Sequence, residues 1–230
     1  MRIKISQMTL LPTIKLTRTV AVASVLAFAI SFVLPTATQA SSAYPKLFGS
    51  REFKSSKLAK FRKWTDVIQR YEASARKQRR KCRVSKVNRC PNRKWRAFLK
   101  KVGSLPLRDQ ITEVNTFFNS IRYIVDPVNY GKRDYWATPI QFFNKNGDCE
   151  DYAISKYISL RKLGVPVKDM RIVVLRDLNL KVAHAVLVVY YKGKPLILDN
   201  QISQVIDANR IRHYQPIYSI NEKNWWLHRS

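Results

Sequence analysis

The sequence predicts an α+β fold in which helices come first along the chain and an antiparallel sheet comes last. Up to about residue 163, apolar residues recur at the three- and four-residue spacings of amphipathic helices. From about residue 171 onward, short runs rich in Val, Ile and Leu are separated by turn residues, a pattern typical of strands. The chain of 230 residues contains no internal repeat and no glycine-rich nucleotide-binding loop.

Residues 1–40 have the composition of a secretory signal peptide. Four basic residues precede an apolar run from Val20 to Leu34, and Pro35 and small residues up to Ala40 follow it. This order of a charged start, an apolar middle and a small-residue cleavage site is that of an export signal. The run is shorter than the ~20 residues that a spanning helix needs, so a retained membrane anchor is the less favoured alternative.

The rest of the chain is strongly basic and long enough for one domain with its own core, which we expect, or for two small lobes. We expect a flexible arm over residues 41–56 and a domain over residues 57–230, which is long enough to enclose its own core. Without residues 1–40 the chain keeps 39 basic and 15 acidic residues, a charge of about +24. Such a charge attracts nucleic acid, anionic lipid, lipopolysaccharide or an acidic protein.

The helical part is expected to contain four helices and one isolated turn. The helices cover about residues 57–76, 95–103, 106–124 and 149–163, and the turn lies at 140–144. The last helix has the clearest boundaries, because Cys149 follows a glycine turn, Gly164 ends the helix and Pro166 comes just beyond.

The sheet is expected to begin with three strands in sequence, Arg171–Arg176, Val182–Tyr191 and Pro195–Leu198. Gly193, with a lysine on each side, provides a hairpin turn between the second and the third. Val205–Ile206 and Tyr214–Ile220 add one or two further strands.

A basic segment, Arg76–Arg96, contains eleven Lys or Arg residues and no acidic residue. Cys82 and Cys90 lie in it, and in an oxidising compartment we predict a disulfide between them that leaves Cys149 as a free thiol. Two unpaired thiols are the alternative. A zinc site is not expected, because no histidine or further cysteine lies near this pair.

Cys149, His184 and Asp199 form the pattern of a thiol nucleophile, its base and an orienting carboxylate. Cys149 opens a helix, where the helix dipole and unpaired backbone N–H groups favour the thiolate and can hold an oxyanion. His184 lies in an apolar strand and would take the thiol proton, and Asp199, at the end of the next strand, would orient its imidazole. Asn200 is an alternative orienting group. The other two histidines lie in polar or terminal surroundings and are not expected to be catalytic.

Several spaced motifs resemble the bacterial transglutaminase-like cysteine peptidases over nearly the whole exported chain. They are Asp134–Pro139, Gly147–Ala153, His184 in its strand and Leu198–Asn200, with Leu47–Glu52, Lys63–Trp64, Val114–Asn115 and Asn119–Tyr123 as further matches. The resemblance implies a papain/transglutaminase-type fold, with the N-terminal helical part packed on the C-terminal sheet and the catalytic cysteine at a helix N-terminus. It also implies a periplasmic location and a Cys149–His184–Asp199 triad.

Characterised members of this family are calcium-dependent proteases that cut the N-terminal region of very large surface adhesins and so release cells from biofilms. An inner-membrane receptor that senses cyclic di-GMP restrains them. The resemblance therefore implies an adhesin as substrate and such a receptor as regulator.

A Ca²⁺ site is expected beside the nucleophile. Asp148, Glu150 and Asp151 provide the hard oxygen donors that suit Ca²⁺, and three carboxylates beside a thiolate would otherwise raise its pKa. The resemblance places calcium on Asp148 and Glu150, with Asp151 as a weaker candidate. The alternative is a set of solvated acidic residues stabilised by the helix dipole.

Trp136 is a weaker site candidate, since a tryptophan lies over the nucleophile or donates to the oxyanion in transglutaminases. A plain core tryptophan is an equally good interpretation, and Tyr135 and Gln141 are weaker still.

Three functional hypotheses stay open on the sequence. They are an endopeptidase, another acyl-transfer enzyme on the same triad (an amidase or a true transglutaminase), and a non-catalytic basic binding protein. The intact triad disfavours the third. For the basic segment, an anionic membrane surface or an acidic protein fits better than specific nucleic-acid binding, and a solvated loop is the alternative.

Overall fold

The computed structural model describes residues 44, 46–81 and 93–229. The expected signal peptide, residues 1–40, and the expected disulfide between Cys82 and Cys90 both lie outside the described residues and stay predictions. None of the helices in the described part of the chain has the length and apolar character needed to cross a membrane.

The predicted α+β class is confirmed. The helices, in chain order, are α1 (Arg62–Lys81), α2 (Arg93–Val102), α3 (Leu107–Asn119), α4 (Asp126–Asn129), α5 (Pro139–Lys145) and α6 (Cys149–Lys162). The strands are β1 (Arg51–Ser55), β2 (Met170–Asp177), β3 (Val182–Tyr191), β4 (Lys194–Leu198), β5 (Ile206–Asp207), β6 (Tyr214–Ile220) and β7 (Trp225–Arg229). The strands form one antiparallel sheet in the order β1-β7-β6-β2-β3-β4-β5.

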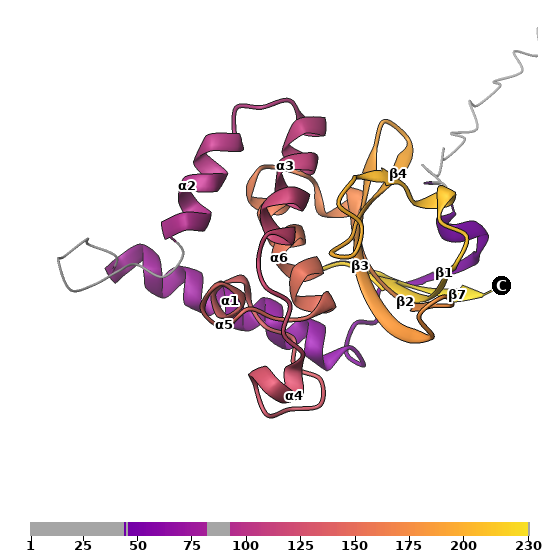
Figure 1. Ribbon diagram of the computed structural model, residues 1–230, viewed down its shortest axis with the longest axis horizontal. Coiled ribbons are helices and arrows are strands. Elements are labelled where there is room, and N and C mark those ends of the chain that lie inside the picture. Colours follow the sequence, from indigo (N-terminus) through magenta and orange to yellow (C-terminus); the bar gives the residue numbers. More distant parts are fainter. Residues whose placement is uncertain (1–43, 45, 82–92, 230) are drawn as a thin grey trace, which may run out of the picture. The chain divides into compact units, whose positions relative to one another are not determined.

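The sheet carries an apolar core on each of its faces. Along β3, Leu187 and Val189 pack with the helices, whereas Val186 and Val188 face a second core. That second core is covered by two short 3₁₀ helices, η1 (Leu47–Gly49) and η3 (Ala208–Arg210). Because both faces are covered, β3 is an almost continuous apolar run rather than an alternating one. Figure 1 shows the helices on one side of the strands.

Helix α6 is enclosed by protein along most of its length. All its residues from Asp151 to Leu160 are buried, and the helix packs against α3, α5, β2 and β3. A helix that is buried all round is held from every side. Its N-terminus, where Cys149 lies, is therefore fixed with respect to the sheet.

The prediction of a flexible arm was wrong for the residues from Leu47 to Ser55. Leu47 is fully buried in the second core, and β1 pairs with β7 along its whole length. Figure 1 shows this N-terminal strand beside the C-terminal one. Strand β7 was also missed by the sequence analysis, because the partner that stabilises it comes from the opposite end of the domain.

The first and third helices differ from the prediction, and α1 ends at Lys81, five residues later than expected. The first helix begins at Arg62, five residues later than expected, because Leu58 and Phe61 form a turn instead. Helix α3 ends at Asn119 although apolar residues continue to Ile124. Beyond it, Tyr123 forms a bridge with Gly147, so these residues extend towards the start of α6.

Candidate active site

A glycine turn sets the position of Cys149. Gly147 pairs with Tyr123, and its carbonyl accepts the Ile124 N–H at 2.9 Å. A Cβ on Gly147 would lie 2.1 Å from the Asp151 Oδ2, so no other residue fits here without moving that carboxylate. The turn therefore presents Cys149 as the first residue of α6.

The structure brings His184 and Asp199 into direct contact. Strands β3 and β4 pair so that Leu187 lies opposite Leu198, which places Asp199 near His184 on the neighbouring strand. His184 Nε2 lies 2.9 Å from Asp199 Oδ1, and both side chains are buried. Asn200, the alternative orienting group, does not make this contact. With Nε2 held by the carboxylate, Nδ1 is the ring nitrogen that can take a proton from a thiol.

Tyr214 and Gln201 complete the surroundings of Asp199. The Tyr214 hydroxyl donates to Asp199 Oδ2 at 2.7 Å, and the Gln201 N–H donates to Oδ1 at 2.9 Å. Burial acts to raise the pKa of Asp199, but the hydrogen bonds from His184, Gln201 and Tyr214 outweigh it and hold that pKa below its ordinary value. Asp199 is therefore a fixed, ionised partner for the imidazole. The contact of Tyr214 with Asp199 was not predicted, because the sequence pattern around Tyr214 indicates only a strand.

The Cys149 thiol lies against β3. It lies near the backbone N–H of Ala185, the residue after His184, and it donates to Glu150 Oε2 at 3.3 Å. Burial, followed by the charges of Glu150 and Asp148, raises the pKa of this thiol well above its ordinary value, and the Ala185 N–H opposes them. Burial and the acidic neighbours thus outweigh the favourable N–H and disfavour the thiolate.

A cluster of three carboxyl groups lies beside the nucleophile, and one of its members was not predicted. Asp126, Asp148 and Glu150 each offer an oxygen within 4.8 Å of the others. Asp126 lies 22 residues before Asp148, and its backbone N–H donates to Asp148 Oδ2 at 3.2 Å. In the sequence, Asp126–Pro127 indicated only the end of a helix. Asp126 comes close to Asp148 because Tyr123 pairs with Gly147.

This cluster has the properties of a cation site. Asp126 Oδ1 and Asp148 Oδ1 are buried and have no hydrogen-bond partner among the described residues. Burial raises the pKa of Asp126 to about 6, although the Tyr135 N–H opposes it, and burial likewise raises the pKa of Asp148 and Glu150. Buried carboxylates that repel one another and have unpaired oxygens fit a hard cation such as Ca²⁺.

Asp151, the weaker predicted ligand, is not part of this group. It is fully buried, and its Oδ1 accepts the Ala137 N–H at 2.6 Å. Its carboxylate therefore ties the loop before α5 to the first turn of α6. Its other oxygen, Oδ2, is the one that excludes a side chain at Gly147.

Trp136 has the contacts of a core residue. Its side chain is 8% exposed and packs edge-on against Trp64, with 6.4 Å between the ring centroids. Arg70 binds this loop through the Trp136 carbonyl and the Gln141 side chain, both at 2.6 Å, and Gln141 in turn donates to the Tyr135 hydroxyl at 2.8 Å. These three residues thus form one connected loop structure, and a role of Trp136 at the oxyanion stays a prediction.

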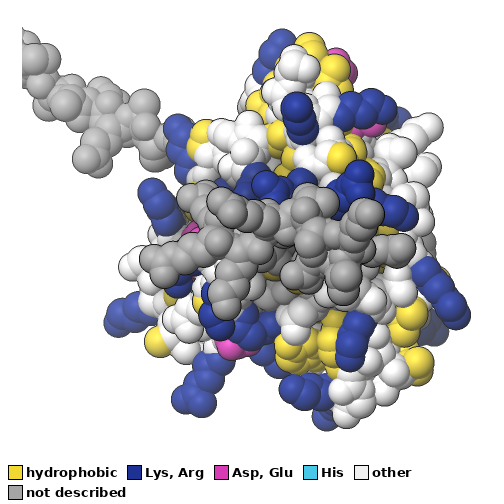
Figure 2. Space-filling model, turned by 90° about the vertical axis from the view of Figure 1, so that its left-hand side faces the viewer, with side chains coloured by type: hydrophobic (Ala, Val, Ile, Leu, Met, Phe, Trp, Pro, Cys, Tyr) yellow, Lys and Arg dark blue, Asp and Glu magenta, His cyan; other side chains and the backbone are white. Residues whose placement is uncertain are grey.

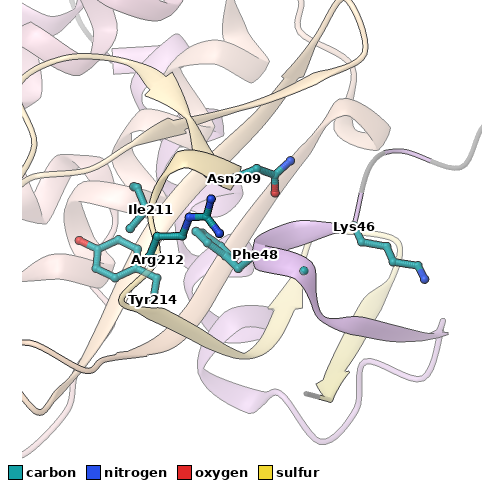
Figure 3. A pocket seen from close by; sticks show the side chains of 7 residues that line it. Lys46, Phe48, Asn209, Ile211, Arg212 and Tyr214 are labelled. Carbon is teal, nitrogen blue, oxygen red and sulfur yellow. The ribbon is translucent and has the colours of Figure 1, made fainter.

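A cavity of about 640 Å³ adjoins the Asp199 side of the site. Figure 3 shows the residues that line it, which are Lys46, Phe48, Gly49, Asn209, Ile211, Arg212 and Tyr214. Tyr214 belongs both to this cavity and to the hydrogen bonds of Asp199. Cys149 and His184 do not line it, so this cavity is not where the thiol meets a substrate.

Comparisons with known proteins agree with this geometry. Residues 70–228 match the family model described as bacterial transglutaminase-like cysteine proteinase BTLCP. LapG of Legionella pneumophila has a solved structure that is 31% identical, with a TM-score of 0.55 over 71% of this chain and 86% of that chain. A calcium-bound and an EGTA-treated structure of that LapG give the same identity, TM-score and coverage of this chain, and cover 86% and 84% of theirs. No curated protein sequence gave a match.

Proposed function

Because the chain belongs to the bacterial transglutaminase-like cysteine proteinases, we propose that it is a periplasmic, calcium-dependent endopeptidase that cuts the N-terminal region of a large surface adhesin. The chain is a cysteine protease by family, and its fold is that of LapG. The observation that carries the proposal is the buried pair of His184 and Asp199 at 2.9 Å, on the sheet against which α6, the helix that begins with Cys149, packs.

The chemistry follows from these three residues. His184 Nδ1 takes the proton of Cys149, and the thiolate attacks the carbonyl carbon of the scissile peptide bond. Backbone N–H groups in the first turn of α6 stabilise the oxyanion. His184 then gives the proton to the leaving amine, so that an acyl-enzyme remains on Cys149. Water, activated by the same imidazole, hydrolyses it, while Asp199 keeps the imidazole in position throughout.

Calcium dependence is supported by the carboxyl cluster and by the calcium-bound and EGTA-treated structures of the related LapG. Asp126, Asp148 and Glu150 would hold the ion. When bound, Ca²⁺ would neutralise the negative charge beside the thiolate and occupy the Glu150 carboxylate that now accepts the thiol proton.

The proposed location and partners have separate support. The composition of residues 1–40 favours export, and the family resemblance favours an adhesin substrate and a cyclic di-GMP-sensing receptor as regulator. Figure 2 shows Lys and Arg side chains across one face of the protein. Helix α2 contributes five exposed basic residues, Arg93, Lys94, Arg96, Lys100 and Lys101. Such a face attracts an anionic membrane surface or an acidic protein chain.

The test is incubation of the purified protein, from residue 41 onward, with the N-terminal fragment of a large adhesin from the same genome. Parallel reactions contain calcium, a chelator, or calcium with the Cys149→Ala variant. We expect a discrete cut only with calcium and the intact thiol, because Cys149 is the nucleophile and its acidic neighbours need a cation.

Other results would change the assignment. Cleavage by Cys149→Ala would exclude the triad, and full cleavage in excess chelator would exclude calcium. An amine probe that becomes attached to glutamine, in place of a cut, would indicate a transglutaminase, the alternative on the same triad.

A further inference from the structure

Helix α6 contains a fully buried lysine for which the proposed chemistry has no use. Lys156 follows Cys149 by seven residues, two helical turns along the same side of α6, and its exposed fraction is 0%. Lysine is almost never fully buried unless it is paired. Burial lowers the pKa of Lys156 to about 7, and the charge of Asp199 opposes this. The ammonium group is therefore a costly feature in the middle of the core.

The partner of Lys156 is an asparagine on α3. Lys156 Nζ donates to Asn115 Oδ1 at 2.8 Å, and Asn115 is also fully buried. An ammonium group can only donate, so the amide oxygen of Asn115 must face it and the amide N–H groups must point away. Asn115 Nδ2 donates to the carbonyls of Ile202 and Ser203 at 3.3 and 3.0 Å. The ammonium group and the two carbonyls thus require the same orientation of the amide, and Lys156 is the group that binds its oxygen.

Those carbonyls belong to the turn that carries Asp199. Asn119, one helical turn after Asn115, donates from Nδ2 to the Asp199 carbonyl at 2.7 Å and to the Ile202 carbonyl at 3.4 Å. The turn of residues 199–203 is therefore bound to α3 by two side-chain amides. From this turn, the Asp199 side chain extends to His184 and contacts its Nε2.

We propose that Lys156 is a positioning residue of the active site: its ammonium orients the Asn115 amide, which holds the turn of residues 199–203 and so keeps the Asp199 carboxylate against His184. The inference rests on the proposed function, since it concerns the same triad. Helix α6 would then carry both the nucleophile and, two turns further on, the group that locates the orienting carboxylate. Misplacement of a catalytic group by about 1 Å can lower the rate ~100-fold. A gain of that size in activity can offset the destabilisation that comes from burying the Lys156 ammonium group.

Substitution of Lys156 separates positioning from packing. Methionine has a similar length and no donor, so Lys156→Met relieves the burial of an ammonium group but leaves Asn115 Oδ1 without its partner. These two effects oppose each other, and we expect little change in thermal stability. If Lys156 served only packing, the Lys156→Met variant would show the reverse. Its stability would be lower, and the molecules that remain folded would turn over substrate normally.

The experiment compares Lys156→Met, Asn115→Asp and the double variant. Asp at position 115 keeps an acceptor for Lys156 but loses both N–H donors to the turn. Ser155→Ala is the matched control, because Ser155 is the neighbouring residue, is also fully buried, and its hydroxyl has no hydrogen-bond partner among the described residues. The measurements are kcat and KM on the adhesin fragment in saturating calcium, the rate of Cys149 alkylation by iodoacetamide, and thermal unfolding.

We expect each single variant to lose about 10- to 100-fold in kcat with KM changed by no more than about threefold. Alkylation of Cys149 should slow in parallel, because the imidazole that supports the thiolate is less well held. The double variant should lose no more kcat per folded molecule than the worse single variant, since both break the same link. It should have the lowest melting temperature, because the carboxylate introduced at position 115 then has no cationic partner. Ser155→Ala should behave like the wild type.

Normal kcat and normal alkylation in a folded Lys156→Met variant would overturn the inference, and so would losses that add in the double variant. If Lys156→Met does not fold, full activity of Asn115→Asp overturns it instead. The alkylation rate also distinguishes failure of the proposed function from failure of the role of Lys156. A wild-type thiol no more reactive than that of His184→Ala refutes the proposed function itself, whereas a reactive wild type with an equally reactive Lys156→Met refutes only the role of Lys156.

Discussion

At the scale of single residues, the site depends on side chains that fix other side chains. Asp199 has three donors, which are His184, Gln201 and Tyr214, and each of its oxygens has a partner. A buried carboxylate that is fully hydrogen-bonded cannot rotate without losing contacts. The imidazole is therefore held in one orientation before any substrate arrives, which is the preorganisation that catalysis needs.

Tyr214→Phe tests this preorganisation. The substitution keeps the ring, which packs edge-on against His184 and Phe48, and removes only the hydroxyl that donates to Asp199 at 2.7 Å. A hydrogen bond to a charged group contributes about 1.5–3 kcal/mol, so we expect kcat to fall roughly 10-fold or more and KM to change little.

Tyr190→Phe is the control for this substitution. Tyr190 packs in the same core, and its buried hydroxyl has no hydrogen-bond partner among the described residues. Its removal should therefore leave kcat unchanged. Equal effects of the two substitutions on kcat would show that the Tyr214 hydroxyl does not act through Asp199.

At the scale of elements, the sequence predicted most of the helices and strands that carry the site. The boundaries of α6 and β3 were correct within a residue, and both triad members on them could be assigned because local pattern and chemistry agreed. Asp126 and Lys156 were missed for a different reason. Each acquires its role only when another segment packs against it, and a lysine in a helical pattern is normally taken as exposed.

The carboxyl cluster brings together α4 and the start of α6, and Asp126→Asn tests whether it binds calcium. Without calcium the variant should be slightly more stable than the wild type, because a buried, repelling carboxylate is removed. With calcium it should lose most of the rise in melting temperature that the wild type shows, since a ligand that binds only the folded state stabilises it.

Asp134→Asn distinguishes the loss of a calcium ligand from the loss of a nearby negative charge. Asp134 is half-exposed and forms an ion pair with Lys63, and its charge acts on Asp126 and Asp148 from outside the cluster. Its removal should leave nearly all of the calcium-induced rise in melting temperature. A calcium response of Asp126→Asn that equals that of the wild type would place the ion elsewhere.

At the scale of the whole domain, the two ends of the described chain close one sheet. Strand β1 pairs with β7, and Glu52 on β1 forms a partly buried ion pair with Arg171 on β2 at 2.7 Å. His228 on β7 lies opposite Glu52 in the strand pairing. Its Nδ1 lies 2.7 Å from the Ser50 Oγ and its Nε2 lies 2.9 Å from the Ser219 Oγ. The sequence could not predict this closure, because none of its contacts is local.

His228 makes this closure sensitive to acid. Ser50 donates its hydroxyl hydrogen to the Leu47 carbonyl at 2.8 Å, so the neutral imidazole donates from Nδ1 to Ser50 and accepts from Ser219 at Nε2. Burial lowers the pKa of His228 to about 4; Glu52 partly opposes this and Arg171 adds to it. The folded state therefore favours the neutral imidazole, while the unfolded chain binds a proton near the ordinary value of about 6.5.

The stabilisation that follows is complete above about pH 6.5 and is lost as the pH falls towards 4, because there only the unfolded state gains the proton. We expect the wild type to lose about 3 kcal/mol of unfolding free energy relative to His228→Gln between pH 7 and pH 4. Denaturant unfolding of both proteins in chelator across this range measures the difference, since the other titrating groups then cancel between them. Parallel pH curves for the two proteins would mean that His228 titrates normally and that β1 and β7 do not bury it in solution.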